Sequence, residues 1–378
     1  MIEVFGINSD PVSHYDDAGP SVEIARAAGF TAVRSPLWLR YGPERHRRFF
    51  DALRAAGLRP LAVLHRDAFT ASEWENGVYE GRVAWWHEEL GPGVDWEAGN
   101  EPEPGAGSAS STMTKQRFAA IIRQTRDAVG TDRVISGGLV SGDPYYVLDT
   151  DSGLQQTIIE CCDGFGNHLY EETLLRLIGT PYAPYAPFVE RVLDYWLPAA
   201  VEVAGKLGLT IDVTEIGFGE RFYGHDLDRV GGAFNAIINE LLPHVRSIYP
   251  FCQDRIMVPD YGMRDGDAVF PSWNICSGFA QALNTIPNPT GEAAPQTPPI
   301  EASEGANVNI EELAQMPQKD HPELPYGMWG LPVGIQGVET RTVYADTPEW
   351  QLIIGTPGPD GQEEAVVITP TGLYRPNP

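Results

Sequence analysis

Short apolar segments alternate with longer amphipathic segments through most of this 378-residue chain, and the alternation repeats eight times. The short segments predict strands at 3–8, 31–39, 59–65, 94–101, 133–142, 163–170, 210–219 and 247–254. The longer segments predict helices at 21–30, 44–57, 79–90, 115–130, 153–162, 186–208, 229–242 and 277–286.

Strands that alternate with helices are typical of a parallel sheet. Eight such units in a row predict a closed (β/α)8 TIM barrel, an α/β fold, over residues 1–286. An open doubly wound sheet is the alternative, but no glycine-rich phosphate loop follows the first predicted strand.

The character of the sequence changes after residue 286. Residues 287–325 are rich in Pro, Glu, Asn and Ala without strong periodicity, which is typical of a linker or a wrapping segment. Further on, residues 340–346 and 350–369 have strand patterns, the second a pair joined by a turn at 358–361. We therefore expect a small β appendage over residues 326–378.

The chain is strongly acidic, with 52 Asp and Glu residues against 26 Lys and Arg residues and a formal net charge of -26. This charge argues against nucleic acid or an anionic membrane as the main partner. No apolar run approaches membrane-spanning length, and the first residues, MIEVFGINSD, resemble a strand rather than a secretory signal. We expect a cytoplasmic location by default, or a place in a viral or extracellular assembly.

Polar side chains gather where the predicted strands end. In barrels of this kind, the loops after the strands converge at one face, where the chemistry takes place. The polar residues at these ends, in chain order, are Arg34, His65, Asn100, Glu101, His168, Tyr170 and Glu215.

Two of these residues, Glu101 and Glu215, end strands that are three positions apart on an eight-strand circle. Their carboxyl groups can therefore face each other across the barrel mouth. Glycoside hydrolysis requires such a pair, because one group donates a proton to the leaving oxygen and the other meets the positive charge at the anomeric carbon. A carboxylate held by an arginine and a tyrosine hydroxyl stays ionised, and its charge favours the protonated form of its neighbour.

Each candidate also has a purely structural interpretation. Asn-Glu-Pro is usually a loop start or a helix cap, Arg34 can form a structural ion pair, and His65 or His168 can be a hydrogen-bonded core histidine. Their common position at one end of the strands favours an enzyme. No His-x-His pair follows the first strand and no close metal-ligand cluster is visible in the sequence, so we expect no metal and no cofactor.

Five short motifs together resemble the clan A glycoside hydrolases, the retaining (β/α)8 enzymes that include families 5, 10, 39 and 51. The motifs are TAVRSPLW with Arg34, LAVLH with His65, GNEP at 99–102, HLY at 168–170 and DVTEIGFG with Glu215. The resemblance covers residues 1–286 and leaves out the tail.

The resemblance implies a reaction on an oligo- or polysaccharide through a covalent glycosyl-enzyme intermediate. Glu101 would be the acid/base, Glu215 the nucleophile, and Asn100 the partner of the sugar 2-hydroxyl. The supporting residues would hold the nucleophile or line the sugar subsite, with Arg34 and Tyr170 in the first role and His65 and His168 in the second.

The eighth predicted strand departs from the clan pattern. Many clan members carry a tryptophan at its end as the floor for the sugar, whereas this chain has SIYPFCQDR, with Phe251, Gln253 and Asp254. Trp273, which we place in the following loop, is the candidate to replace that tryptophan.

A protein of another class is the alternative function. A carbohydrate-binding or particle-associated barrel, such as a viral appendage, would recognise a glycan with little or no turnover. The proline-rich tail suits assembly into a larger particle through the C-terminal segment. The presence of both Glu101 and Glu215 favours the enzyme.

Overall fold

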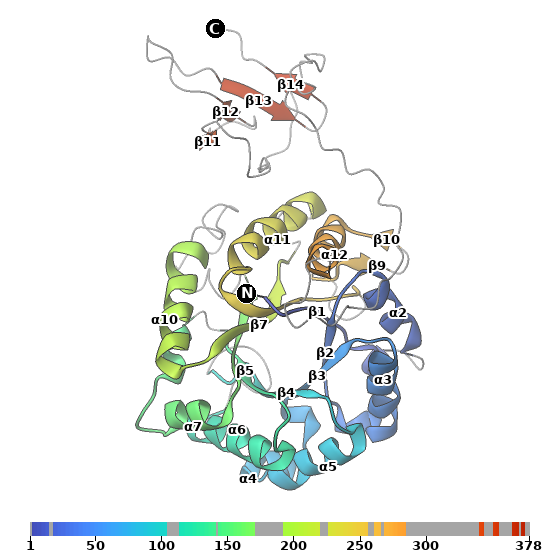
Figure 1. The fold of residues 1–378 in the computed structure, drawn as a ribbon, viewed down its shortest axis with the longest axis vertical. Coiled ribbons are helices and arrows are strands. Elements are labelled where there is room, and N and C mark those ends of the chain that lie inside the picture. Colours follow the sequence, from blue (N-terminus) through green and yellow to red (C-terminus); the bar gives the residue numbers. More distant parts are fainter. Residues whose placement is uncertain are drawn as a thin grey trace. The chain divides into compact units, whose positions relative to one another are not determined.

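Eight parallel strands form a closed barrel in sequence order, and the helices surround it (Figure 1). The protein is represented by a computed structural model that describes residues 2–14, 18–103, 113–140, 143–170, 192–219, 226–255, 261–265 and 268–284, together with the four strands at 340–343, 351–354, 365–369 and 372–374. The predicted (β/α)8 TIM barrel is confirmed.

The barrel strands are close to their predicted positions. They are β1 (Val4–Asn8), β2 (Ala32–Pro36), β3 (Arg59–Leu64), β4 (Asp95–Asn100), β5 (Val134–Gly138), β6 (Gly164–Tyr170), β7 (Thr210–Gly217) and β8 (Val245–Pro250). The eighth strand ends four residues earlier than predicted, at Pro250, which has no N–H to donate to a neighbouring strand.

Helices and helical turns connect the strands. The helices are α1 (Pro11–His14), α2 (Gly19–Ala27), α3 (Pro43–Ala55), α4 (Ala71–Asn76), α5 (Glu80–Leu90), α6 (Lys115–Val129), α7 (Leu154–Cys161), α10 (Leu197–Leu207), α11 (Leu227–Leu241) and α12 (Pro271–Asn284). Short helical turns lie at η1 (Leu39–Tyr41), η2 (Arg66–Ala68), η3 (Pro144–Val147) and η4 (Val192–Trp196). The start of the helix predicted over 186–208 lies outside the described residues.

The helix α6 illustrates how the sequence specifies these elements. Thr114 caps its N-terminus by accepting a hydrogen bond from the backbone N–H of Arg117 at 3.2 Å. Phe118, Ile121 and Ile122 recur at helical spacing and are fully buried. Removing a large apolar side chain of this kind from water contributes about 1.5–3 kcal/mol.

The chain divides into two compact units, residues 1–289 and 290–378. The second unit contains an antiparallel sheet in the order β11 (Thr340–Val343), β12 (Gln351–Ile354), β13 (Ala365–Thr369) and β14 (Gly372–Tyr374). The predicted C-terminal β structure is therefore confirmed. The linker predicted over 287–325 and the turn at 358–361 lie outside the described residues.

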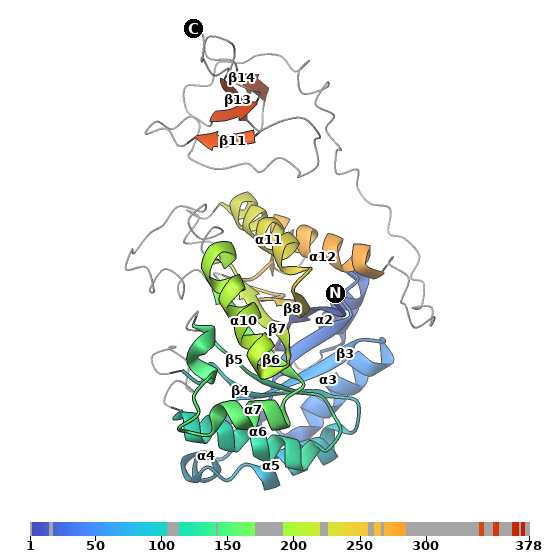
Figure 2. The ribbon, with the colours of Figure 1, turned by 60° about the vertical axis from the view of Figure 1, so that its left-hand side comes forward.

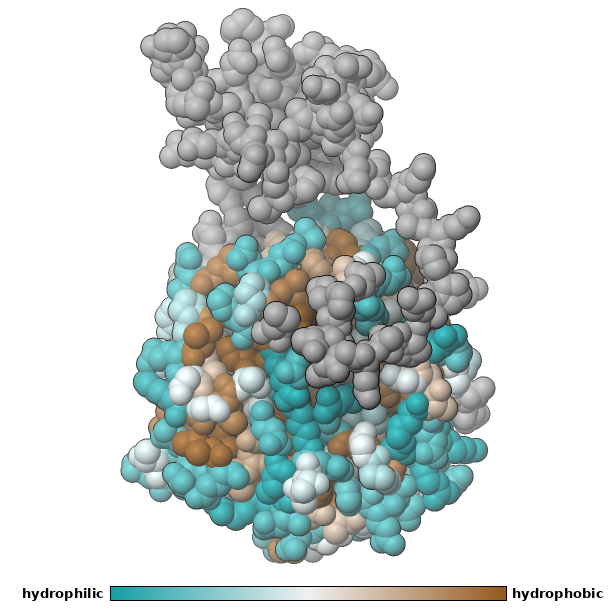
Figure 3. Space-filling model, viewed as in Figure 1, coloured by the Kyte–Doolittle hydropathy of each residue, from teal (hydrophilic) through white to brown (hydrophobic). Residues whose placement is uncertain are grey.

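The outside of the barrel carries helices and several exposed apolar side chains. The helices α10, α11 and α12 lie along its outside (Figure 2), and α12 and a two-stranded ribbon of β9 (Arg264–Asp265) and β10 (Ala268–Val269) follow β8 in the chain. Figure 3 shows apolar side chains on the flank where α10 lies, and Tyr195 and Val201 are exposed there. Within the described ranges, no helix combines the length and the apolar character needed to cross a membrane.

His46, on α3, is a buried histidine with both ring nitrogens hydrogen bonded. Its Nε2 accepts from the backbone N–H of Trp38 at 3.0 Å, and its Nδ1 donates to the carbonyl of Gly42 at 2.9 Å. Burial lowers the pKa of His46 to about 4. The folded protein therefore keeps this ring neutral where an unfolded chain would protonate it.

This shift makes the barrel less stable in acid. Between about pH 6.5 and pH 4 the unfolded chain binds more protons at His46 than the folded chain does, so the free energy of unfolding falls as the pH falls. We expect His46→Gln to reduce that slope by up to about 1.4 kcal/mol per pH unit, measured by urea unfolding at several pH values. The exposed His244 provides the control, His244→Gln. Equal slopes in wild type and His46→Gln would contradict the assignment.

Candidate active site

Glu215, on β7, lies at the centre of the candidate site and is only 6% exposed. Arg34, from β2, donates from Nη1 to Glu215 Oε1. The hydroxyl of Tyr170, from β6, donates to Glu215 Oε2. Both oxygens of this carboxylate thus accept a hydrogen bond from a buried side chain, which stabilises the ionised form.

A β-bulge in β7 directs Glu215 into the site. The pairing of β6 with β7 shifts by one residue, so that Asn167 pairs with Val213 but His168 pairs with Glu215. The skipped residue, Thr214, donates from Oγ1 to a carboxylate inside the barrel. Consecutive residues of a regular strand face opposite sides, and the bulge lets both Thr214 and Glu215 reach the interior.

Glu101 directly follows β4 and has an unusual backbone conformation. Its φ of 47° is positive, and no other non-glycine residue in the described part of the chain shares this. Gly99, two residues earlier, has a φ of 97°. A left-handed conformation costs a non-glycine residue on the order of 1 kcal/mol or more, and such strain concentrates at functional sites. The turn it creates places both Asn100 and Glu101 at the barrel mouth.

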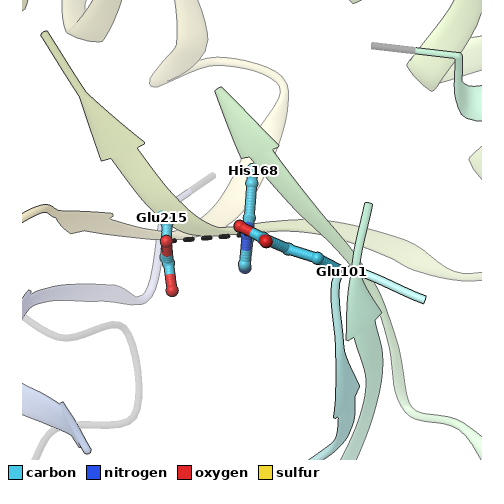
Figure 4. A group of neighbouring side chains, drawn as sticks. All are labelled: Glu101, His168 and Glu215. Carbon is cyan, nitrogen blue, oxygen red and sulfur yellow. Dashed lines mark hydrogen bonds and ion pairs between the residues drawn. The ribbon is translucent and has the colours of Figure 1, made fainter. Parts of the chain in front are cut away.

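His168, on β6, lies between the two carboxylates (Figure 4). Its Nδ1 is 3.3 Å from Glu101 Oε1 and 3.6 Å from Glu215 Oε2. Burial alone would lower the pKa of His168, but the charge of Glu215 and hydrogen bonds with Glu101 and Glu97 raise it to about 10. The ring is therefore protonated at neutral pH and supplies a second buried cation beside Arg34.

Glu101, His168 and Glu215 also have the composition of a metal-ligand group, since one ligand atom of each lies within 4.8 Å of the other two. Two cations, Arg34 and the protonated His168, already balance charge at these carboxylates. A histidine must lose its proton to bind a metal. This group could hold a metal ion only if His168 gave up its proton, and the expected absence of a metal and a cofactor stays a prediction.

Two buried residues of this network, Glu97 and Asn8, were not among the sequence candidates. Glu97, on β4, accepts from Arg34 Nε at 2.6 Å and from Nη2 at 3.1 Å. Asn8, at the end of β1, accepts from Arg34 Nη1 at 2.8 Å. One sequence signal was available: acidic residues recur at every second position of β4, at Asp95 and Glu97, as side chains on one face of a strand do.

Asn100 ends β4, and His65 directly follows β3. Asn100 Oδ1 accepts a hydrogen bond from Arg34 Nη2 at 2.9 Å. The NH2 group of Asn100 therefore remains to donate a hydrogen bond to a ligand hydroxyl. The His65 ring packs edge to face against Trp38, with 4.5 Å between centroids. Burial lowers the pKa of His65 to about 4, and its Nε2 is buried without a partner in the described part of the chain.

Trp273 does not join this group in the structure. It lies in the first turn of α12 rather than in a loop, and it is buried. Its ring packs edge to face against Phe30 at 5.4 Å, and the Arg264 guanidinium is 5.3 Å from its centroid. These are contacts of a core residue. Phe251, which follows β8, does reach the site, because its ring packs edge to face against Tyr170 at 5.7 Å.

Gly138, at the end of β5, provides the space that His168 occupies. A Cβ at this position would lie 2.0 Å from His168 Nε2. We expect Gly138→Ala to displace the ring and to lower the free energy of unfolding by about 1–3 kcal/mol, the usual cost of overpacking, measured by urea unfolding. Gly205→Ala on α10 is the matched control, because its Cβ meets nothing within 4 Å and alanine is the better helix former. Equal effects of the two changes would contradict this account.

Comparisons with known proteins identify relatives of the fold. No family model matches the chain and no curated protein does. Among solved structures, the barrel is similar to an endo-beta-1,4-mannanase from Thermotoga petrophila, with a TM-score of 0.54 and 13% identity over 75% of this chain and 77% of that chain. An endo-beta-1,4-glucanase from Xanthomonas axonopodis pv. citri has a TM-score of 0.54 and 13% identity, over 74% of this chain and 100% of that chain. An exo-beta-1,4-mannosidase from an Opitutaceae bacterium has a TM-score of 0.53 and 15% identity, over 73% of this chain and 59% of that chain. These similarities are of fold alone, and they agree with the (β/α)8 barrel that the sequence predicts.

Proposed function

We propose that the protein is a retaining glycoside hydrolase in which Glu215 is the nucleophile and Glu101 the acid/base. The observation that carries the proposal is the spacing of the two carboxyl groups. One oxygen of Glu101 and one oxygen of Glu215 lie within 4.8 Å of each other at the barrel mouth. Retaining enzymes place these groups about 5–5.5 Å apart, and inverting enzymes place them about 6.5–9.5 Å apart to admit a water. The short spacing therefore favours direct attack by a carboxylate.

The first half of the reaction forms the glycosyl-enzyme. An oxygen of Glu215 attacks the anomeric carbon while the bond from that carbon to the leaving oxygen breaks, and Glu101 gives its proton to the leaving oxygen. Arg34 and Tyr170 each donate a hydrogen bond to the carboxylate of Glu215 and fix its orientation.

The second half releases the sugar. Glu101, now a carboxylate, takes a proton from a water molecule as that water attacks the anomeric carbon. The bond between the carbon and Glu215 breaks, and both carboxyl groups return to their starting states. Two inversions at one carbon leave its configuration unchanged.

The balance of buried charge supports this division of roles. Arg34 and His168 carry two positive charges, and Glu97 and Glu215 carry two negative charges. A proton placed on the remaining carboxyl group, that of Glu101, as the first half of the reaction requires, would leave these four charges balanced. An acid is thus placed beside an ionised nucleophile.

A β-linked oligo- or polysaccharide is the proposed substrate, because the similar solved structures are named as enzymes for β-1,4-linked glucans and mannans. Asn100 and the neutral His65 would donate or accept hydrogen bonds with sugar hydroxyls, and Phe251 would present an apolar surface beside Tyr170. The alternative of a non-catalytic glycan-binding barrel gains no specific observation from the site. Assembly into a particle through the C-terminal segment stays a prediction.

The two carboxyl groups can be distinguished by measuring how the rate of each variant depends on the leaving group of the substrate. Without its acid, Glu101→Ala should lose on the order of 100-fold or more in kcat/KM on substrates with poor leaving groups, and far less on activated aryl glycosides. Added azide should restore turnover of the activated substrates and give a glycosyl azide of unchanged configuration, identified by NMR.

Glu215→Gln is the matched comparison, because it keeps the shape of the side chain and removes the nucleophile. It should abolish turnover for every leaving group, and azide should not produce a glycosyl azide of unchanged configuration. Equal losses in Glu101→Ala for good and poor leaving groups would contradict the role of Glu101 as acid.

A further inference from the structure

Glu97 is a fully buried carboxylate beneath the reacting groups. Besides its two hydrogen bonds from Arg34, it accepts from the backbone N–H of Gly138 at 3.0 Å and from Thr214 Oγ1 at 3.2 Å. His168 Nε2 lies 3.5 Å from its Oε1. Each of its partners is a residue of the site or the immediate neighbour of one. Glu97 itself has no solvent-exposed surface, so it cannot contact a substrate directly.

We propose that Glu97 is a positioning residue, whose carboxylate fixes the Arg34 guanidinium and balances the charge of the His168 ring beneath Glu101 and Glu215. The inference rests on the proposed function for its catalytic consequence. Its structural content, the control of Arg34 and His168, can be measured separately.

The first effect of Glu97 is on Arg34. Among its hydrogen-bond partners, the guanidinium has two carboxylates: Nε donates to Glu97 and Nη1 donates to Glu215. Without the Glu97 charge, the whole positive charge of Arg34 would face Glu215. That would stabilise the nucleophile before the reaction more than in the transition state, where its negative charge is being lost, so turnover would slow.

The second effect is on His168, whose Nε2 lies between two opposing neighbours. Arg34 Nη2 is 3.4 Å away and Glu97 Oε1 is 3.5 Å away. A protonated ring can donate to Glu97, whereas a neutral ring can accept from Arg34. The other groups that face the ring are the carboxylates of Glu101 and Glu215 and the phenol of Tyr170.

The carboxyl group of Glu97 is ionised at neutral pH. Burial opposes ionisation, but Arg34 and the hydrogen bond with His168 outweigh it and lower the pKa of Glu97 to about 2. Glu97 therefore stays ionised across the neutral range and favours the protonated state of His168.

The barrel contains a matched control in a second buried ion pair. Asp212, on β7, is 0% exposed and accepts from Arg133 at 2.7 Å and from Ser247 Oγ at 2.6 Å. These contacts do not include any residue of the candidate site. Asp212→Asn thus makes the same replacement as Glu97→Gln, an amide for a buried carboxyl group that pairs with an arginine, away from the reacting groups.

The experiment compares wild type, Glu97→Gln, Glu97→Asp and Asp212→Asn in the full chain. The His168 ring is titrated by NMR, and kcat and KM are measured on an activated aryl glycoside across pH, below the melting temperature of each variant. In Glu97→Gln we expect the His168 midpoint to fall by about one pH unit or more. We expect kcat to fall on the order of 100-fold with KM little changed, and the alkaline limb of the rate profile to move to lower pH.

Glu97→Asp, which keeps the charge, should restore most of the His168 midpoint. Asp212→Asn should lose stability but keep the wild-type His168 midpoint and the wild-type pH profile. A folded Glu97→Gln protein with the wild-type midpoint and kcat would overturn the inference. If Glu97→Gln does not fold, Glu97→Asp and the wild-type titration decide, and a wild-type His168 midpoint at or below about pH 6.5, its ordinary value, would overturn it.

The same measurements separate this inference from the proposed function. A wild-type protein without glycosidase activity, but with a His168 midpoint that depends on Glu97, would refute the function and leave the control of His168 by Glu97 standing. An active wild type with no dependence on Glu97 would leave the function and refute the inference.

Discussion

The Arg34 guanidinium is the interaction on which the rest of the site depends. It joins the first, second, fourth and seventh strands by hydrogen bonds to Asn8, Glu97, Asn100 and Glu215. A buried arginine keeps its charge, so the interior must provide carboxylates close to it. Removing one partner from a buried ion pair typically costs about 3–5 kcal/mol, although an intact pair contributes little net stability. The apolar strands and helices must therefore stabilise the barrel, while Arg34 determines where the charged groups lie.

Charged groups occur at two levels inside the barrel. At one level, Arg133 pairs with Asp212 near the start of β7, where the pairing of β7 with β8 shifts register between Ile211 and Asp212 but no non-glycine residue has a positive φ. At the other, Arg34 meets the carboxylates at the strand ends, and the backbone departs from regular geometry at Glu101 and at the bulge beside Glu215. In the described part of the chain, the left-handed φ of a non-glycine residue occurs only at the second level, at Glu101, and such strain indicates that this level has a function beyond stability. Both departures turn a carboxylate toward His168.

The barrel could be predicted from the sequence because its signal is spread over eight repeats, and the loss of one segment would not hide it. The strand-end residues could be predicted because a parallel barrel gathers them at one face. Glu97 lies inside β4, where the recurrence of acidic residues at Asp95 and Glu97 indicates a shared face of the strand but not a place in the network. Asn8 ends β1, and a single asparagine there does not distinguish a network residue from a structural one. The bulge that pairs His168 with Glu215 is a shift of a single residue, which periodicity does not detect. Trp273 was placed by its distance along the chain from β8, but its ring packs in the core of α12, because sequence distance does not determine the direction of a side chain.

Glu215 attacks the anomeric carbon in the proposed reaction, and the sugar is then bound covalently to this residue. In an activated 2-deoxy-2-fluoro β-glycoside of glucose or mannose, the fluorine slows both halves of such a reaction, and the good leaving group keeps the first half faster than the second. Incubation of the protein with this compound should therefore let the covalent intermediate accumulate. Mass spectrometry of the digested protein should then find one glycosyl group attached to the peptide that contains Glu215, and an unlabelled substrate should give a first product of retained configuration by NMR. Hydrolysis with inversion, or a label on a different residue, would contradict the account.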